Sequence, residues 1–173
     1  PDIRHKTEAG AVKVNIRTEI ALIDAYREIL ANSKEYDSKA ELRGVLIQEM
    51  LEDGRETLVG IAQDEQFGLV IVFGLGGIFV EVLKDISLRV APIRREDAEE
   101  MIKEIKGYET LKAFRGKPGA DIDGIIDTLL RISQLSIDLE EFISELDINP
   151  LVVLDKGKGV KVADALVVLK NRD

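Results

Sequence analysis

The stretch that most constrains the fold lies near the end of the chain and has the pattern of a β-hairpin. Two arms, Glu145–Leu154 and Val160–Ala165, alternate apolar residues with polar or β-branched ones, and the turn between them, Lys156–Gly159, contains glycine. Alternation with a period of two is typical of strands, and a short glycine-bearing turn joins antiparallel neighbours. We therefore expect an antiparallel sheet.

Polar side chains interrupt the apolar pattern of this hairpin. Asp147 and Asn149 are two residues apart, so both project from one face of a strand, and Asp164 can return to that face from the second arm. Carboxylate and amide oxygens are hard donors that suit Mg²⁺, whose other ligands are water and phosphate oxygens. The alternative is that these residues only cap or end strands, where Asp and Asn are common.

Composition bounds the class of protein. The chain has 173 residues, which is enough for one domain or for two small lobes that share an interface. It has no cysteine, so disulfides and thiolate sites are excluded, and its net charge of −9 argues against a general nucleic-acid-binding surface. No apolar run reaches the ~20 residues of a membrane span, and the polar N-terminus lacks a signal-peptide core, so we expect a cytoplasmic protein.

The first residues are polar and carry the only histidine. His5 stands between Arg4 and Lys6 in a loop that ends at Gly10, where it can face an anion. Neutral imidazole can act as a nucleophile towards a phosphoryl group, but an exposed surface histidine is the alternative. The chain starts at Pro1 without a methionine, and we expect a processed product, an expression fragment or part of a longer polypeptide.

Helices and strands mix without a regular βαβ repeat, which predicts an α+β fold. Amphipathic helices are expected at Glu19 to about Ser33, with Thr18 as N-cap, at Arg95–Lys106, and from the N-cap Asp121 to about Ser136. A polar loop is expected at 32–39. Strands are expected at 12–16, 44–51, 56–62, 69–73 and 82–90, with 44–51 and 56–62 forming an antiparallel pair.

A glycine-rich segment follows the strand predicted at 69–73. Gly74, Gly76 and Gly77 free the backbone to bring N–H groups towards an anion, although glycines also mark ordinary turns. No Gly-Lys-Ser/Thr follows, so the segment is not a P-loop, and no helical pattern follows directly, which argues against a dinucleotide fingerprint.

The strand predicted at 82–90 carries Asp85, Ser87 and Arg89 on one parity. A lone arginine among apolar residues needs an anionic partner or access to solvent. Arg89 therefore either forms a structural salt bridge with Asp85 or binds another anion, such as a phosphate, which a planar guanidinium can hold through two oxygens.

Four separated motifs resemble one family. Residues 145–151 with the later Ala163-Asp164, residues 1–12, residues 73–81 and residues 84–92 are similar to the ATP-grasp domain of β subunits of ADP-forming acetate–CoA ligases. The resemblance covers nearly the whole chain and implies an ATP-grasp fold without its N-terminal portion. It assigns residues 1–45 to part of the smaller N-terminal lobe and 46–173 to the C-terminal lobe with the metal hairpin.

The resemblance also implies roles for individual residues. It makes His5 a relay for the phosphoryl group between a phosphohistidine of the partner subunit and the nucleotide. It makes Arg89 a phosphate ligand and places Glu49 at the ribose, with Met50 and Leu51 lining the base. One departure is Ala11, which follows Gly10 where the family usually has a second glycine. The resemblance implies that Gly74, Gly76, Gly77 and Glu81 face the nucleotide. It implies that Asn149 and Asp164 are the Mg²⁺ ligands, with Glu145 and Asp147 as weaker candidates for the metal.

The implied reaction is the reversible conversion of an acyl-CoA such as acetyl-CoA, ADP and phosphate into the acid, CoA and ATP. This chain would handle ADP or ATP, and a CoA-binding α subunit or fused domain would form the acyl phosphate. Two alternatives stay open: another ATP-grasp ligase that makes an amide and needs no histidine relay, and a nucleotide-binding or assembly module without turnover.

Overall fold

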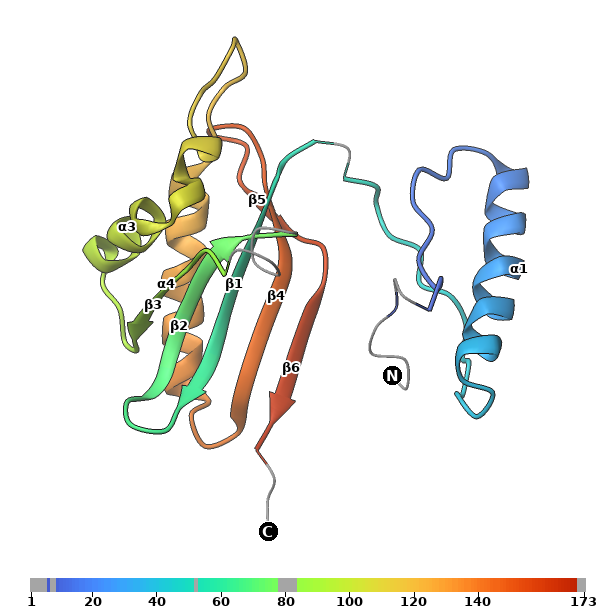
Figure 1. Cartoon of the computed structure of the whole chain (residues 1–173), viewed down its shortest axis with the longest axis horizontal. Coiled ribbons are helices and arrows are strands. Elements are labelled where there is room, and N and C mark those ends of the chain that lie inside the picture. The colour runs from blue at the N-terminus through green and yellow to red at the C-terminus, as the bar shows by residue number, and fades with distance from the viewer. Residues whose placement is uncertain (1–5, 7–8, 52, 78–83, 171–173) are drawn as a thin grey trace. The chain divides into compact units, whose positions relative to one another are not determined.

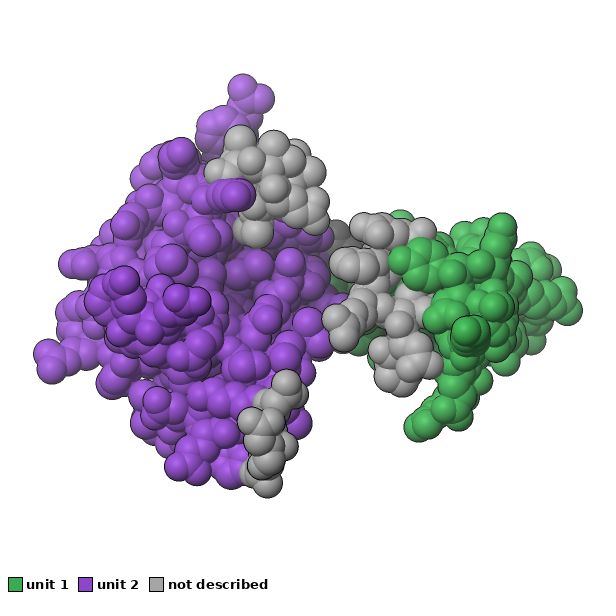
Figure 2. Space-filling view, turned by 60° about the horizontal axis from the view of Figure 1, so that its bottom comes forward, with its two compact units in different colours: residues 1–52 green, residues 53–173 purple. Residues whose placement is uncertain are grey.

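The computed structural model describes residues 6, 9–51, 53–77 and 84–170. The chain divides into two compact units, residues 1–52 and 53–173, which are green and purple in Figure 2. The sequence predicted a boundary between residues 45 and 46 that separates two lobes of a larger fold. The two compact units do not test that assignment, so it stays a prediction.

Unit 1, residues 1–52, is built around one long helix. Helix α1 spans Glu19–Tyr36, and its N-cap is Thr18, whose side-chain oxygen accepts a hydrogen bond from the amide of Ala21 at 3.2 Å. The Asn32 side chain donates to the carbonyl of Gly10 at 3.0 Å and so fastens the preceding segment to the helix. The predicted helix start is confirmed, but the loop predicted at 32–39 is wrong over residues 32–36 because the helix continues to Tyr36.

The strands predicted in unit 1 are wrong. Residues 12–16 and 44–51 are irregular, and Leu46 is 80% exposed. An extended segment becomes a strand only when its amides and carbonyls bond to a neighbouring strand. In the described part of unit 1 no second strand supplies those partners.

Unit 2, residues 53–173, contains an antiparallel sheet (Figure 1). Among the described residues the sheet has six strands in the order β3-β2-β1-β4-β5, and β6 pairs with the other part of β4. The predicted pairing of 44–51 with 56–62 is wrong, because β1 lies between β2 and β4. The strands are β1 (Arg55–Asp64), β2 (Gly68–Leu75), β3 (Ile86–Val90), β4 (Ile143–Val153), β5 (Val160–Val162) and β6 (Ala165–Leu169).

Helices cover one face of this sheet, as Figure 1 shows for α3 and α4. The three helical segments are α3 (Arg95–Glu104), the 3₁₀ helix η1 (Lys106–Leu111) and α4 (Ile122–Asp138). Alternate residues of β1 and β2, such as Val59 and Phe73, are fully buried against apolar side chains of the helices, such as Ile125 and Leu129. The predicted α+β class with an antiparallel sheet is confirmed.

Alternation also defines the opposite face, called here the open face. Because successive side chains of a strand point to opposite sides, the even-numbered residues of β1 and β2 lie on this face when the odd-numbered ones face the helices.

No described helix combines the length and the apolar character needed to cross a lipid bilayer.

Candidate functional site

The predicted hairpin is confirmed and brings Asn149 beside Asp164. Strand β5 pairs with residues 151–153 of β4, and β6 pairs with residues 143–148 of the same strand. Asp164 lies between β5 and β6, directly opposite Asn149, whose amide donates to the carbonyl oxygen of Asp164 at 3.2 Å. Two of the predicted oxygen donors therefore lie on neighbouring backbone segments.

A β-bulge places these residues relative to the glycine-rich segment. Thr57 pairs with Leu151 and Val59 with Ile148, so Asn149 and the residue after it both lie opposite Leu58. The extra residue keeps the buried side chains in register on both sides of the irregularity.

Leu58 pairs on its other side with Gly74 of β2. Gly74, Leu58, Asn149 and Asp164 thus form a row across four neighbouring backbone segments, which we call the cross-strand row. At about 4.8 Å between adjacent strands, Gly74 lies roughly 10 Å from Asn149. That separation can be bridged by a bound metal ion and the phosphates of a nucleotide.

The electrostatics beside the row favour a cation. Asp147 lies on the open face, opposite Gly60 and Leu166 of the flanking strands. Burial raises the pKa of its carboxyl above the ordinary value, and the negative charges of Glu145 and Asp164 raise it further. Like charges that repel one another on a half-buried surface are relieved by a bound cation.

The donor set fits Mg²⁺ held together with a nucleotide. Among the described residues no group of three His, Cys, Asp or Glu side chains gathers at metal-binding distance. The side chains of Asn149 and Asp164 therefore supply only part of the ligands that a metal ion needs. Mg²⁺ usually takes only one or two protein carboxylates and completes its shell with water and phosphate oxygens.

The glycines next to the row allow a close backbone approach. The amide of Gly76 donates to the carbonyl of Glu56 at 2.8 Å. A Cβ atom on Gly76 would lie 2.9 Å from the Cβ of Glu56, so a larger residue would push the two segments apart. Gly77 has a φ of +61°, a conformation that glycine adopts without strain. Gly77 therefore uses the conformational freedom of glycine, and the phosphate contacts of these glycines stay a prediction.

Arg89 lies on the other face of the sheet from the row. Its guanidinium pairs with Glu104 of α3 at 2.8 Å and with Glu100 at 3.7 Å. The sequence allowed a structural salt bridge between Arg89 and Asp85, and Asp85 is the wrong partner. Its carboxylate instead accepts hydrogen bonds from the amides of Lys106 and Gly107, each at 2.7 Å. The predicted role of Arg89 towards phosphate stays a prediction.

The remaining predicted site residues lie in unit 1 or outside the described part of the chain. Glu49, Met50 and Leu51 belong to unit 1, where they are part of an irregular segment instead of the end of a buried strand. His5 and Glu81 lie outside the described residues. The roles of these five residues stay predictions.

Sequence reasoning missed the second task of Asp121. This residue caps α4 as predicted, accepting from the amide of Gly124 at 3.2 Å, but its other carboxylate oxygen accepts from the amide of Gly159 at 2.7 Å. The turn of the metal hairpin is thereby tied to the start of α4. The cap could be found from its local pattern, whereas the second acceptor contact joins residues that are 38 positions apart.

The chain matches the family model described as an ATP-grasp domain over residues 1–169. It belongs to the ATP-grasp family. The ATP-grasp chain is 48% identical over 170 residues to acetate–CoA ligase (ADP-forming) II subunit beta from Pyrococcus furiosus, and the match covers 98% of this chain and 72% of that subunit. It is also 48% identical over 160 residues to acetate–CoA ligase (ADP-forming) I from Archaeoglobus fulgidus, of which it covers 23%.

Solved structures agree with this assignment. The ATP-grasp chain resembles the dinucleotide-forming acetyl-coenzyme A synthetase 1 of Ca. Korarchaeum cryptofilum in complex with coenzyme A, Ca-AMPCP and HgCl⁺, with a TM-score of 0.92 and 45% identity over 98% of this chain and 73% of that one. A structure of the same synthetase with coenzyme A and Mg-AMPPCP has its phosphohistidine segment pointing towards the nucleotide-binding site, with a TM-score of 0.82 and 42% identity over 98% of this chain and 73% of that one.

These matches confirm the predicted family: the chain belongs with the β subunits of ADP-forming acetate–CoA ligases. It spans 72% of the length of the related subunit and about a quarter of the single-chain ligase.

Proposed function

We propose that this chain is the nucleotide-handling part of a cytoplasmic, ADP-forming acyl-CoA synthetase that uses ADP and ATP. The observation that carries the proposal is the position of Asn149 opposite Asp164, in a row with Gly74, on the open face of an ATP-grasp sheet. The related β subunit and the structures with bound nucleotide analogues support the same role.

Asn149 and Asp164 would hold Mg²⁺, which neutralises negative charge on the nucleotide phosphates when bound. The raised pKa of Asp147 supports this assignment, since a cation would relieve the repulsion that Glu145 and Asp164 impose on it. The segment Gly74–Gly77 would lie close to the phosphates, because its glycines permit near contact, although the amide of Gly76 already donates to the carbonyl of Glu56.

The phosphoryl group would reach ADP through His5. A partner polypeptide converts an acyl-CoA and phosphate into an acyl phosphate and CoA. The phosphorus–oxygen bond of the acyl phosphate then breaks as a phosphorus–nitrogen bond forms on a histidine of the partner, which releases the acid. The phosphoryl group passes from that histidine to His5, where a new phosphorus–nitrogen bond forms. Attack by ADP breaks that bond and gives ATP and free histidine. Such transfers depend mainly on placement and charge stabilisation.

The partner in this scheme is a CoA-binding α subunit or an equivalent fused domain. The name of the related subunit from P. furiosus, subunit beta, and the coenzyme A bound in the Korarchaeum structures support it. An amide-forming ATP-grasp ligase would use a similar nucleotide site but would neither accept CoA nor need His5.

The test uses the complex of this chain with its CoA-binding partner, supplied with acetyl-CoA and labelled phosphate. The wild-type chain should acquire acid-labile label that passes into ATP when ADP is added, and His5→Asn should acquire none. Asn149→Ala serves as the matched variant: it should still be labelled, because the metal pair is not needed to form phosphohistidine, but should pass its label to ADP slowly.

Label that forms equally on the His5→Asn chain would contradict the relay. ATP formation that needs an amine acceptor instead of CoA would assign the chain to the amide-forming ligases. Nucleotide binding without any transfer in an active complex would leave only a binding or assembly role.

A further inference from the structure

A small hairpin stands out from unit 2 between η1 and α4. Residues 112–118 are all exposed, and Figure 1 shows this loop extending beyond the sheet and helices of the unit. Phe114 and Lys117 exchange two backbone hydrogen bonds of 3.1 and 3.0 Å. The two residues between them, Arg115 and Gly116, have φ values of +48° and +80°, which is the signature of a tight two-residue hairpin turn. We call residues 112–118 the cationic hairpin.

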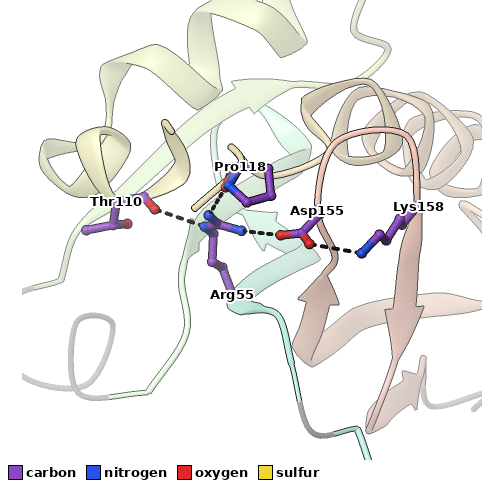
Figure 3. Close-up of polar contacts among 5 residues, drawn as sticks. All are labelled: Arg55, Thr110, Pro118, Asp155 and Lys158. Atoms are coloured by element: carbon purple, nitrogen blue, oxygen red, sulfur yellow. Dashed lines mark hydrogen bonds and ion pairs between the residues drawn. The ribbon is translucent and has the colours of Figure 1, made fainter. Parts of the chain in front are cut away.

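One half-buried guanidinium braces both ends of the cationic hairpin (Figure 3). Arg55 donates from Nε to the carbonyl of Thr110 at 3.1 Å and from a terminal nitrogen to the carbonyl of Pro118. Its other terminal nitrogen lies 3.7 Å from the carboxylate of Asp155, which also accepts from Lys158 at 3.0 Å. Because one side chain holds Thr110 before the hairpin and Pro118 at its end, the hairpin is fixed to the end of the sheet where β1 begins.

The Asp155 carboxylate keeps its charge in this arrangement. The hydrogen bond from Lys158 is the main cause that lowers its pKa, and the nearby charge of Arg55 adds to the effect. Arg55 therefore has an ionised partner throughout the physiological pH range, and the brace stays formed. A preformed, rigid loop loses little conformational entropy on binding.

The tip of the hairpin combines an exposed ring with two cations. Phe114 is 66% exposed, and the Arg115 guanidinium lies over its ring, 5.0 Å from the centroid. Lys117 follows on the returning arm. Within the part of the chain that the structure describes, no carboxylate lies at ion-pair distance from Arg115 or Lys117, whereas Lys112 at the base pairs with Glu109.

These properties point to a protein surface as the binding partner. Small ligands are usually held in concave pockets, whereas this feature is a convex projection. A chain of net charge −9 is poorly suited to nucleic acid, even with a few cations at one tip. Aromatic rings and arginines are the residue types enriched at protein–protein contacts, where they anchor the interface.

We propose that the cationic hairpin docks onto an acidic surface of the CoA-binding polypeptide, with Phe114 inserted into an apolar hollow and Arg115 and Lys117 facing carboxylates. This inference rests on the proposed function, because it names the contact between the two halves of that enzyme. Arg55 acts as a positioning residue that holds the hairpin in its docking conformation.

The experiment measures the dissociation constant of the complex by titration at low and moderate salt, with the full chain and its CoA-binding partner. Phe114→Ala and the double change Arg115→Glu and Lys117→Glu should each weaken association by about 10- to 100-fold. The charge variant should also show a smaller salt dependence than the wild type. Affinity for ADP with Mg²⁺ and the melting temperature should stay unchanged in both.

Two exposed residues of the same unit give matched controls. Phe67, which is 64% exposed in the turn between β1 and β2, controls for loss of a surface ring when changed to Ala. Lys103 of α3, with a side chain that is 60% exposed, controls for reversal of charge when changed to Glu. Both controls should associate like the wild type. Arg55→Ala should weaken association although the tip residues are intact, and Arg55→Lys should restore only part of the affinity, since Lys cannot hold both carbonyls and Asp155 together.

Tip variants that bind the partner as tightly as the wild type would overturn the docking proposal while leaving ATP formation, and thus the proposed function, in place. Loss of ADP affinity in the tip variants would also overturn it, as would self-association of the isolated chain that disappears with the tip. If the wild-type chain neither associates with a CoA-binding partner nor makes ATP with it, the proposed function and this inference fail together.

Discussion

Two apolar runs of the same type end in opposite environments. Residues 69–73 of unit 2 form part of β2, between β1 and β3, and Ile71 and Phe73 are fully buried. Residues 44–51 of unit 1 have a similar apolar character, yet they are irregular, and Leu46 is 80% exposed. The difference lies in the neighbours, since β2 has ladder partners on both sides. An apolar run thus gives a segment the capacity to pair, and the partner provides the burial.

The long helices show the same contrast. Helices α1 and α4 have 18 and 17 residues, and each begins at a capping side chain. The apolar stripe of α4 is packed in the core through Ile125 and Leu129, whereas Ile20 of α1 is 74% exposed. Capping and periodicity therefore define a helix in both units, but in unit 1 the described structure buries only Ala25 among the apolar residues of α1.

The largest expected effect compares one residue from each run. Phe73→Ala should lower the free energy of unfolding by about 3–5 kcal/mol, because it leaves a cavity in a closely packed core. Leu46→Ala should change it by no more than about 0.5 kcal/mol, since its side chain is already in solvent. Denaturant unfolding followed by circular dichroism measures both. An equal cost for Leu46→Ala would mean that residues 44–51 are packed in solution.

The helix caps give the next largest difference. Asp121→Ala should cost about 2–3 kcal/mol, because it removes acceptors from the amides of Gly124 and Gly159 at a buried position. Thr18→Ala should cost about 1 kcal/mol or less, since Thr18 accepts one exposed hydrogen bond. Thermal unfolding measures both variants. Equal effects would show that the contact between Asp121 and the hairpin turn adds nothing.

The smallest expected effect is a gain in stability. The pKa of Asp147 is raised above its ordinary value of 3.8, mainly by burial, so the folded chain binds this proton more tightly than the unfolded chain does. The ionised carboxyl is therefore destabilising at pH 7, and the penalty fades as the pH falls through the raised pKa towards 3.8. Asp147→Asn should raise the metal-free melting temperature at pH 7, and by less at pH 4.

Asp64 is the matched control with the opposite sign. The amides of Phe67 and Gln66 lower its pKa by hydrogen bonding, so its ionised form stabilises the fold above pH 3.8, and that contribution is lost as the pH falls. Asp64→Asn should lower the melting temperature at pH 7. A melting temperature that falls with Asp147→Asn would contradict the like-charge account of the open face.

The elements of unit 2 could be predicted because their signals are local. The cap at Asp121, the apolar period of α4 and the alternating arms of the metal hairpin each lie within one short stretch. The pairing of β1 with β4 could not be predicted, because Thr57 and Leu151 are 94 residues apart and no local pattern joins them. The bulge opposite Leu58 depends on that pairing, so it could not be predicted either.

The candidate site divides in the same way. Asn149 and Asp164 could be predicted as neighbours because the hairpin that joins them is short. The partners of Arg89 could not, since Glu100 and Glu104 approach it only once α3 folds back over β3. Nothing in the sequence indicated the role of Arg55. Its hydrogen-bond acceptors are main-chain carbonyls 55 and 63 residues away, and because every residue has a carbonyl, the sequence does not mark these two.

The most direct test of the metal pair is a calorimetric titration of ADP into the complex, with and without Mg²⁺. We expect Mg²⁺ to strengthen ADP binding by the wild type, and this gain to fall at least about tenfold in Asn149→Ala and in Asp164→Asn. Asp127→Asn, on α4 where the carboxylate pairs with Arg131, should keep the full gain. A gain from Mg²⁺ that is the same in all four proteins would contradict the account, because Asn149 and Asp164 would then not hold the metal.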